Sequence, residues 1–180
     1  PSLTAGTNAA GSVTVGACGF FNYTSGLAIF IDLNQDGDFT DAGEKVYSNG
    51  GASNIDCVPA TVVPVSLTIP ASALNGVTRM RVVSREGGVI AGGGDAITPC
   101  TVNGYGETED YLVNITGGIT YTYTWSPAVT GNATTASVTT LPLTTATTYT
   151  AVLNDGLCSS APSAPITVAI AGTPILTPTA

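Results

Sequence analysis

Glycine and proline interrupt the chain throughout, and no segment of ten or more residues shows helical periodicity. Between these breaks, apolar and polar residues alternate in short runs, which is typical of half-buried β-strands. The alternation is clearest over 62–69, where Pro64 lies on the polar face and predicts an edge strand. We therefore predict an all-β fold made of two β-sandwich domains in tandem, of jelly-roll or Ig-like type.

The same reading gives the individual strands. In the first part of the chain we expect strands at 12–15, 27–32, 44–47, 62–69, 77–84 and 110–115. In the second part we expect them at 120–125, 134–139, 147–153 and 165–170.

The composition changes near residue 117. All four basic residues and eleven of the twelve acidic residues precede it, whereas Asp155 is the only charged residue that follows it. We predict a first domain over 1–116, calcium-binding for the reasons given below, and a second sandwich over 117–171. Residues 172–180 form a linker or an exchanged strand in this interpretation.

The charged and nucleophilic residues exclude several functions. The chain has no histidine, which removes Ser-His-Asp and Cys-His catalysis, and Lys45 is its only lysine. A glycosidase that uses two carboxylates is the enzyme class left open, and we expect no enzyme. The net charge of −8 disfavours nucleic acids and anionic membranes and favours cations. The longest apolar run, 27–31, is too short to enter a bilayer.

The four cysteines lie far apart, without a CxxC motif, which favours disulfides in an oxidising compartment over a zinc site. We therefore expect an exported, extracellular protein. Three intrachain pairings are possible. The one we favour joins Cys57 to Cys100 and Cys18 to Cys158.

The segment 32–44 carries the clearest chemical pattern. Oxygen ligands at its positions 1, 3 and 5, followed by Gly37 at position 6, are typical of a loop that binds Ca²⁺. The pattern departs from an EF-hand at its end, where the glutamate comes one residue late and the flanks read as strands. An acidic, solvated turn is the alternative. The predicted calcium ligands are Asp32, Asn34, Asp36, Asp38 and Glu44, with Asp41 as an additional candidate.

A second acidic group comes directly before the predicted strand at 110–115. Its carboxylates either complete the calcium shell or pair with arginines of the strand at 77–84. The acidic residues are Glu107, Glu109 and Asp110, and the arginines are Arg79, Arg81 and Arg85.

Three motifs in this order resemble the GEVED domain of secreted bacterial proteins, especially those of Bacteroidetes. They are the acidic run from Asp32 to Glu44, Thr78-Arg79-Met80-Arg81-Val82, and Gly106-Glu107-Thr108-Glu109-Asp110-Tyr111 after Cys100. The resemblance covers about 27–115. It implies a β-sandwich module without catalytic activity, in multidomain surface proteins exported by the type IX system. Residues 118–171 are similar to the Ig/PKD-like repeats of Bacteroidetes adhesins.

From these observations we expect a non-enzymatic, extracellular, calcium-stabilised adhesive or structural module of a bacterial cell-surface protein. Its expected partners are other copies or further domains of the same protein, and extracellular glycans or surfaces. Two other functions compete with this one. The first is a subunit of a self-assembling extracellular filament, because weakly charged, threonine-rich strands lack the lysines that prevent edge pairing. The second is a carbohydrate-binding accessory module.

Overall fold

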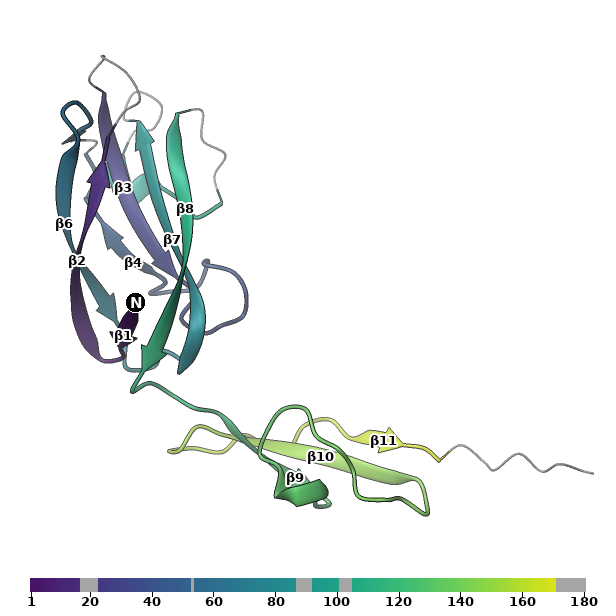
Figure 1. The fold of residues 1–180 in the computed structure, drawn as a ribbon. Coiled ribbons are helices and arrows are strands. Elements are labelled where there is room, and N and C mark those ends of the chain that lie inside the picture. The colour runs from purple at the N-terminus through teal and green to yellow at the C-terminus, as the bar shows by residue number, and fades with distance from the viewer. Residues whose placement is uncertain (17–22, 53, 87–91, 101–104, 171–180) are drawn as a thin grey trace, which may run out of the picture. The chain divides into compact units, whose positions relative to one another are not determined.

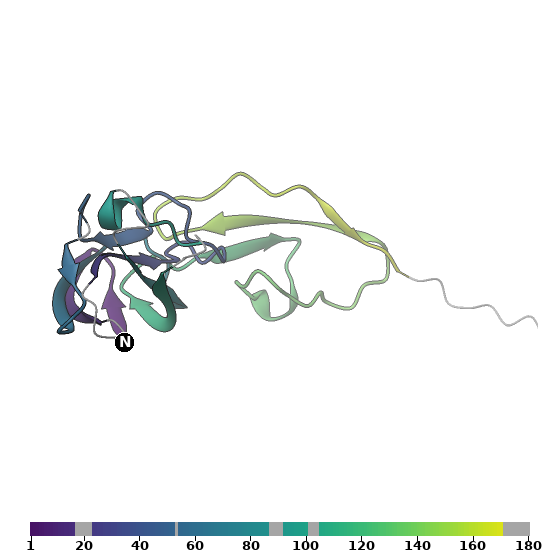
Figure 2. The same ribbon diagram turned by 90° about the horizontal axis from the view of Figure 1, so that it is seen from above.

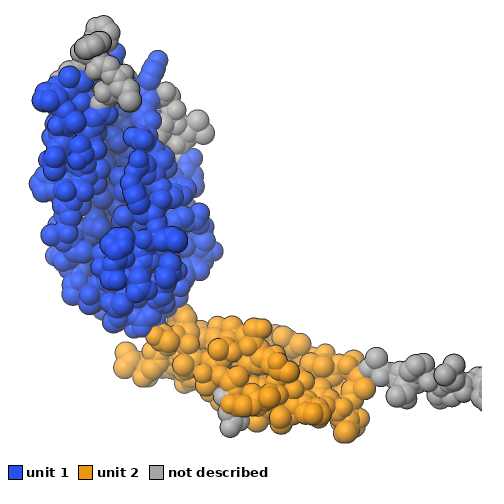
Figure 3. Space-filling model, in the orientation of Figure 1, with its two compact units in different colours: residues 1–119 blue, residues 120–180 orange. Residues whose placement is uncertain are grey.

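The computed structural model describes residues 1–16, 23–52, 54–86, 92–100 and 105–170. These residues form eleven strands and two short 3₁₀ helices, so the predicted all-β fold is confirmed. None of the helices among them is long and apolar enough to cross a membrane. The chain divides into two compact units, Pro1–Ile119 and Thr120–Ala180, which are coloured separately in Figure 3.

The main sheet of the first unit has the strand order β1-β8-β7-β3-β4, and β5 also pairs with β3 (Figure 1). β1 and β8 run parallel, and all the other pairs in this sheet are antiparallel. The strands are β1 (Ser2–Thr4), β3 (Thr24–Ile31), β4 (Lys45–Ser48), β5 (Ile55–Asp56), β7 (Gly76–Glu86) and β8 (Gly106–Thr116).

The remaining strands of this unit, β2 (Thr7–Val15) and β6 (Thr61–Ile69), form a two-stranded antiparallel sheet that is paired over its full length. Within the described residues β6 pairs only with β2, so the predicted edge position is confirmed. Pro64 lies opposite Ser12 in this ladder. Alternate residues of β6 are buried, from Val63 to Ile69, and they belong to the same core cluster as the inner residues of β3.

β3 is buried on both faces, which explains why its sequence is an uninterrupted apolar run. Leu27, Ile29 and Ile31 face the core shared with β2 and β6, here called the inner face. Ala28 and Phe30 point to the opposite, outer face of the sheet. There they pack in a smaller cluster with Phe39, Val83 and Ile97. The outer face is therefore covered by connecting segments rather than by a second sheet.

The short helix η1 (Gly93–Ala96) covers part of the outer face, and its backbone lies directly against β3. A Cβ added at Gly26 would lie 2.7 Å from the carbonyl carbon of Gly93, and one added at Gly94 would overlap the Leu27 carbonyl and the Asn49 side chain. The glycines are needed here because two backbones approach each other too closely for side chains.

The second unit is a three-stranded antiparallel sheet in the order β11-β10-β9, and the strands lie side by side in Figures 1 and 2. They are β9 (Thr122–Ser126), β10 (Thr147–Asn154) and β11 (Ile166–Val168), with the short helix η2 (Thr130–Asn132) after β9. Tyr149 and Val129 are its buried apolar side chains among the described residues.

The strand predicted at 134–139 is wrong, because these residues form bends and irregular chain. The Thr134 carbonyl accepts a hydrogen bond from Tyr123 N–H at 2.9 Å, and the Thr139 carbonyl accepts one from Thr130 N–H at 3.0 Å. These two carbonyls therefore have hydrogen-bond partners, although the segment forms no β-ladder. Threonine favours strands, but the two apolar residues of this segment bury little surface, since Ala136 is exposed and Val138 is only partly buried.

Candidate metal site

The acidic loop 32–44 connects β3 to β4, and both of its ends are tied to the main sheet. Ile31 N–H donates to the Glu44 carbonyl at 2.9 Å, which closes the base of the loop. Asp32 N–H donates to the Arg79 carbonyl at 3.1 Å, and the Thr78 hydroxyl donates to the Asp32 carbonyl at 2.7 Å. The loop therefore starts and ends on a fixed scaffold.

Phe39 anchors the middle of the loop. Its ring is 4% exposed and packs on the ring of Phe30, with 6.4 Å between the ring centroids. The guanidinium groups of Arg79 and Arg81 lie over the same ring, at 5.4 and 5.1 Å from its centroid. Arg79 also donates to the Gly37 carbonyl at 3.0 Å. A single aromatic side chain thus holds the loop against the outer face of the sheet.

Two of the acidic residues are buried and shape the loop from inside. Asp32 accepts hydrogen bonds from the backbone N–H groups of Asp36 and Gly37, both at 3.2 Å. Glu44, which is 1% exposed, accepts from Leu33 N–H at 2.8 Å and from Asp41 N–H at 3.3 Å. Burial raises the pKa of Glu44 above its ordinary value. Asp32 thus connects the start of the loop to Asp36 and Gly37, and Glu44 connects the end of the loop to Leu33 and Asp41.

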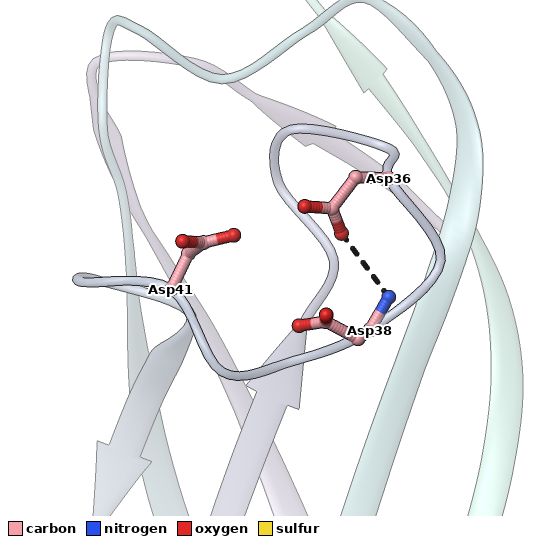
Figure 4. A group of neighbouring side chains, drawn as sticks. All are labelled: Asp36, Asp38 and Asp41. Carbon is pink, nitrogen blue, oxygen red and sulfur yellow. Dashed lines mark hydrogen bonds between the residues drawn. The ribbon is translucent and has the colours of Figure 1, made fainter.

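Three exposed carboxylates gather at the tip. Those of Asp36, Asp38 and Asp41 have oxygens that all lie within 4.8 Å of one another, and Figure 4 shows them around one space inside the loop. Asn34 donates its side-chain amide to Asp36 at 2.9 Å and to Asp41 at 2.7 Å. The Asp38 N–H bond to Asp36, and then the Asn34 amide, lower the pKa of Asp36. These hydrogen bonds favour the ionised form of Asp36.

This set of donors fits a hard cation. Carboxylate and amide oxygens are the ligands that Ca²⁺ prefers, and it takes six to eight of them in irregular geometry. The described residues bring no histidine or cysteine into the group, so the softer transition metals find no preferred ligand. Because the three aspartates are exposed, water can supply the remaining ligands.

The structure groups the predicted ligands differently from the sequence pattern. Asp36 and Asp38 lie together with Asp41, which the sequence offered only as an additional candidate. Asp32 and Glu44 bond to the loop backbone instead. The position of Asp41 depends on how the chain returns to β4 after Phe39 is buried, and ligand spacing carries no signal for that.

The second acidic group has a different role. Asp110 lies directly opposite Arg81 in the β7–β8 ladder and pairs with it through two hydrogen bonds of 2.7 Å. The bonds from Arg81 lower the pKa of Asp110, and the bond to Asp110 raises the pKa of Arg81. Glu109 bonds to the Tyr111 hydroxyl, and Glu107 is exposed on β8. Among the described residues, none of these three acids joins the aspartate group of the loop.

The predicted bond between Cys57 and Cys100 is not formed. Cys57 is buried in the inner core, with its Sγ atom 3.2 Å from the Ser25 hydroxyl. Cys100 is an exposed free thiol that follows Pro99, whose carbonyl accepts a bond from Arg81 on the outer face. The main sheet therefore separates the two sulfurs. Cys158 is likewise an exposed free thiol, and its predicted partner, Cys18, lies outside the described residues.

Comparison with known proteins gives a family match for the segment that contains the acidic loop. No curated protein and no solved structure matches the chain. The resemblance inferred from the sequence over 27–115 is confirmed, since residues 26–114, which run from β3 through the acidic loop into β8, match the GEVED domain family.

Proposed function

We propose that the chain is a non-enzymatic, calcium-stabilised adhesive or structural module of an exported bacterial surface protein. The proposal rests on the three clustered carboxylates of Asp36, Asp38 and Asp41 at the tip of a loop whose base and middle are fixed. Like charges at this separation repel one another, and a bound cation removes that repulsion. Calcium then stiffens the connection between β3 and β4.

The acidic residues of the loop have two different roles. Asp32 and Glu44 keep the loop closed from inside, so the exposed aspartates are held near one another before any ion binds. Preformed geometry lowers the ordering cost of binding, but the exposed position keeps the affinity moderate. We expect a dissociation constant of about 10⁻⁴ to 10⁻³ M, as in extracellular calcium modules.

The proposal includes the architecture and the location. The first unit acts as a β-sandwich, with the inner core between the main sheet and the β2–β6 pair. The second acts as an Ig/PKD-like repeat, and export follows the type IX route of the bacterial proteins that the chain resembles. The match of 26–114 to the GEVED domain supports this assignment for the first unit. Partners are further domains or copies of the same protein and extracellular glycans or surfaces.

A second candidate, the filament subunit, is favoured by one observation. Within the described residues, β2 and β6 each pair on one side only, which leaves two strand edges for an added strand. The carbohydrate-binding alternative finds less support, because the Trp125 indole is partly covered and donates its N–H to the Thr135 carbonyl at 3.1 Å. An exposed stacking surface for a sugar is not formed there.

Calorimetric titration of calcium into the full chain tests the proposal. Asp36→Asn removes one charge from the cluster, and Asp155→Asn is the control, since it removes one charge from a partly buried position in the second unit. The wild type and the control should bind with the affinity given above, and Asp36→Asn should bind at least about tenfold more weakly. Absence of binding in the wild type, or equal affinity in all three proteins, refutes calcium binding at this loop.

A further inference from the structure

The segment 73–75, between β6 and β7, contacts two parts of the first unit that are far apart in sequence. On one side it bonds to the acidic loop, and on the other to residues 118–119, which lead out of β8 toward the second unit. Residues 117–119 are called the exit segment below. All of these contacts lie within the first unit.

The contact with the acidic loop is made by Gln35 and Leu33. The Gln35 side-chain amide donates to the carbonyls of Leu74 and Asn75, both at 3.1 Å, and Leu74 N–H donates to the Leu33 carbonyl at 2.9 Å. Gln35 has a φ of 57°, and it is the single non-glycine residue with positive φ among those that the structure describes. Backbone in this region is costly for a residue with a side chain, so the surrounding contacts must hold it in place.

The contact with the exit segment is a double clamp. Asn75 N–H donates to the Ile119 carbonyl at 2.8 Å, and Ile119 N–H donates to the Ala73 carbonyl at 2.9 Å. The Asn75 side chain binds Gly118 in both directions, with its amide on the carbonyl at 2.9 Å and its oxygen on the N–H at 2.8 Å. A Cβ at Gly118 would overlap the Ala73 carbonyl, so the fit requires glycine.

We propose that cation binding in the acidic loop restrains the exit segment through Gln35 and the segment 73–75. This inference rests on the proposed function, and it adds the part of the chain that the ion controls. Gln35 directly precedes Asp36, so an ion that fixes Asp36 also fixes the backbone from which the Gln35 amide reaches Leu74 and Asn75. The coupling is reciprocal, so loss of the clamp weakens calcium binding by the factor by which calcium restrains the exit segment.

Amide hydrogen exchange of the full chain, followed by NMR with and without calcium, tests the coupling. Gly37 and Asp38 report on the loop, and Gly118 and Ile119 report on the exit segment. In the wild type, calcium should slow exchange at both places, by roughly 5-fold or more at the exit segment. Thr68→Ala, an exposed change on β6, is the control and should behave as the wild type.

Two variants cut the connection at different points. Gln35→Ala removes the two side-chain bonds on the loop side, and Asn75→Ala removes the two side-chain bonds of the clamp and leaves the loop residues unchanged. The backbone bonds of Leu74 and Ile119 remain in both variants. In both, calcium should still slow exchange at Gly37 and Asp38, while its effect on exchange at Gly118 and Ile119 should be clearly smaller than in the wild type.

The outcomes separate the two claims. If calcium slows exchange in the wild-type loop but not in the exit segment, the coupling is refuted and calcium binding stands. The coupling is also refuted if calcium protects the exit segment equally in the wild type and in both variants. If calcium leaves the loop amides of the wild type unchanged, calcium binding itself fails, and the coupling fails with it.

Discussion

Replacing Phe39 by alanine should destabilise the first unit strongly, although Phe39 belongs to a connecting loop. Its ring is 4% exposed and packs on Phe30, and two arginines lie over its face. Truncation of a buried phenylalanine to alanine costs about 3 to 5 kcal/mol. Because a domain has only about 5 to 15 kcal/mol of total stability, the loss is a large fraction of it.

A second variant separates burial from the interaction with the arginines. Phe39→Leu keeps most of the apolar contact but removes the ring that Arg79 and Arg81 cover. Because both arginines are themselves partly exposed, each cation–π contact contributes about 0.5 to 1 kcal/mol, and the two together give about 1 to 2 kcal/mol. Phe39→Leu should therefore cost clearly less than Phe39→Ala.

Urea unfolding of the full chain, followed through the NMR signals of Ile29 and Val83, measures both changes. These two residues lie on β3 and β7, so their signals report on the first unit alone. Surface substitutions and other mild ones usually lower the free energy of unfolding by less than about 1 kcal/mol. A loss this small in Phe39→Ala would show that the cluster on the outer face is not a core. Equal losses in the two variants would show that burial of the leucine-sized part contributes nothing.

Three further results are expected. Calcium at about 10 to 100 times its dissociation constant should stabilise the chain by about 1.4 to 2.7 kcal/mol in thermal unfolding, EDTA should abolish this gain, and Asp36→Asn should reduce it by about 1 kcal/mol or more; identical midpoints in calcium and EDTA would contradict it. Asp110→Asn should cost about 0.5 to 1 kcal/mol near neutral pH. Arg81 lowers the pKa of Asp110 below 3.8, so the pair stabilises the fold above that pH and its contribution is lost as the pH falls through the folded-state pKa; a cost that does not decrease on acidification would refute this. Gly26→Ala places a Cβ 2.7 Å from the backbone of η1 and should cost about 1 to 3 kcal/mol in urea unfolding, whereas Gly11→Ala, whose Cβ meets only a side chain at 3.6 Å, is the control that should stay near wild type.

The strands with strong apolar alternation could be predicted from the sequence. β6 was found because its buried residues recur at every second position. β1 and β5 were missed, and so was the first half of β2, which reads Thr7 to Gly11 with only two alanines as apolar residues. These strands form because β8, β3 and β6 offer them hydrogen-bonding partners, and that information is not local.

The acidic loop was also found from the sequence, because side chains with ligand oxygens at every second position and a glycine at position 6 form a recognisable pattern. The roles within the loop were not. Asp32 and Asp36 have the same chemistry, and only burial directs one to the backbone and leaves the other at the tip. The disulfide prediction failed for a related reason, since sequence spacing does not say that the main sheet lies between Cys57 and Cys100.

The sequence by itself determined the fold class, the break in composition near residue 117 and the acidic loop, because each is written in local residue patterns. Only the tertiary structure decided which carboxylates meet, that Phe39 is a core residue, and that Gln35 and Asn75 connect the loop to the exit segment. The physical reason is that these contacts join residues that are distant in sequence. Their formation depends on which face of the sheet each segment covers, and periodicity along the chain cannot encode that.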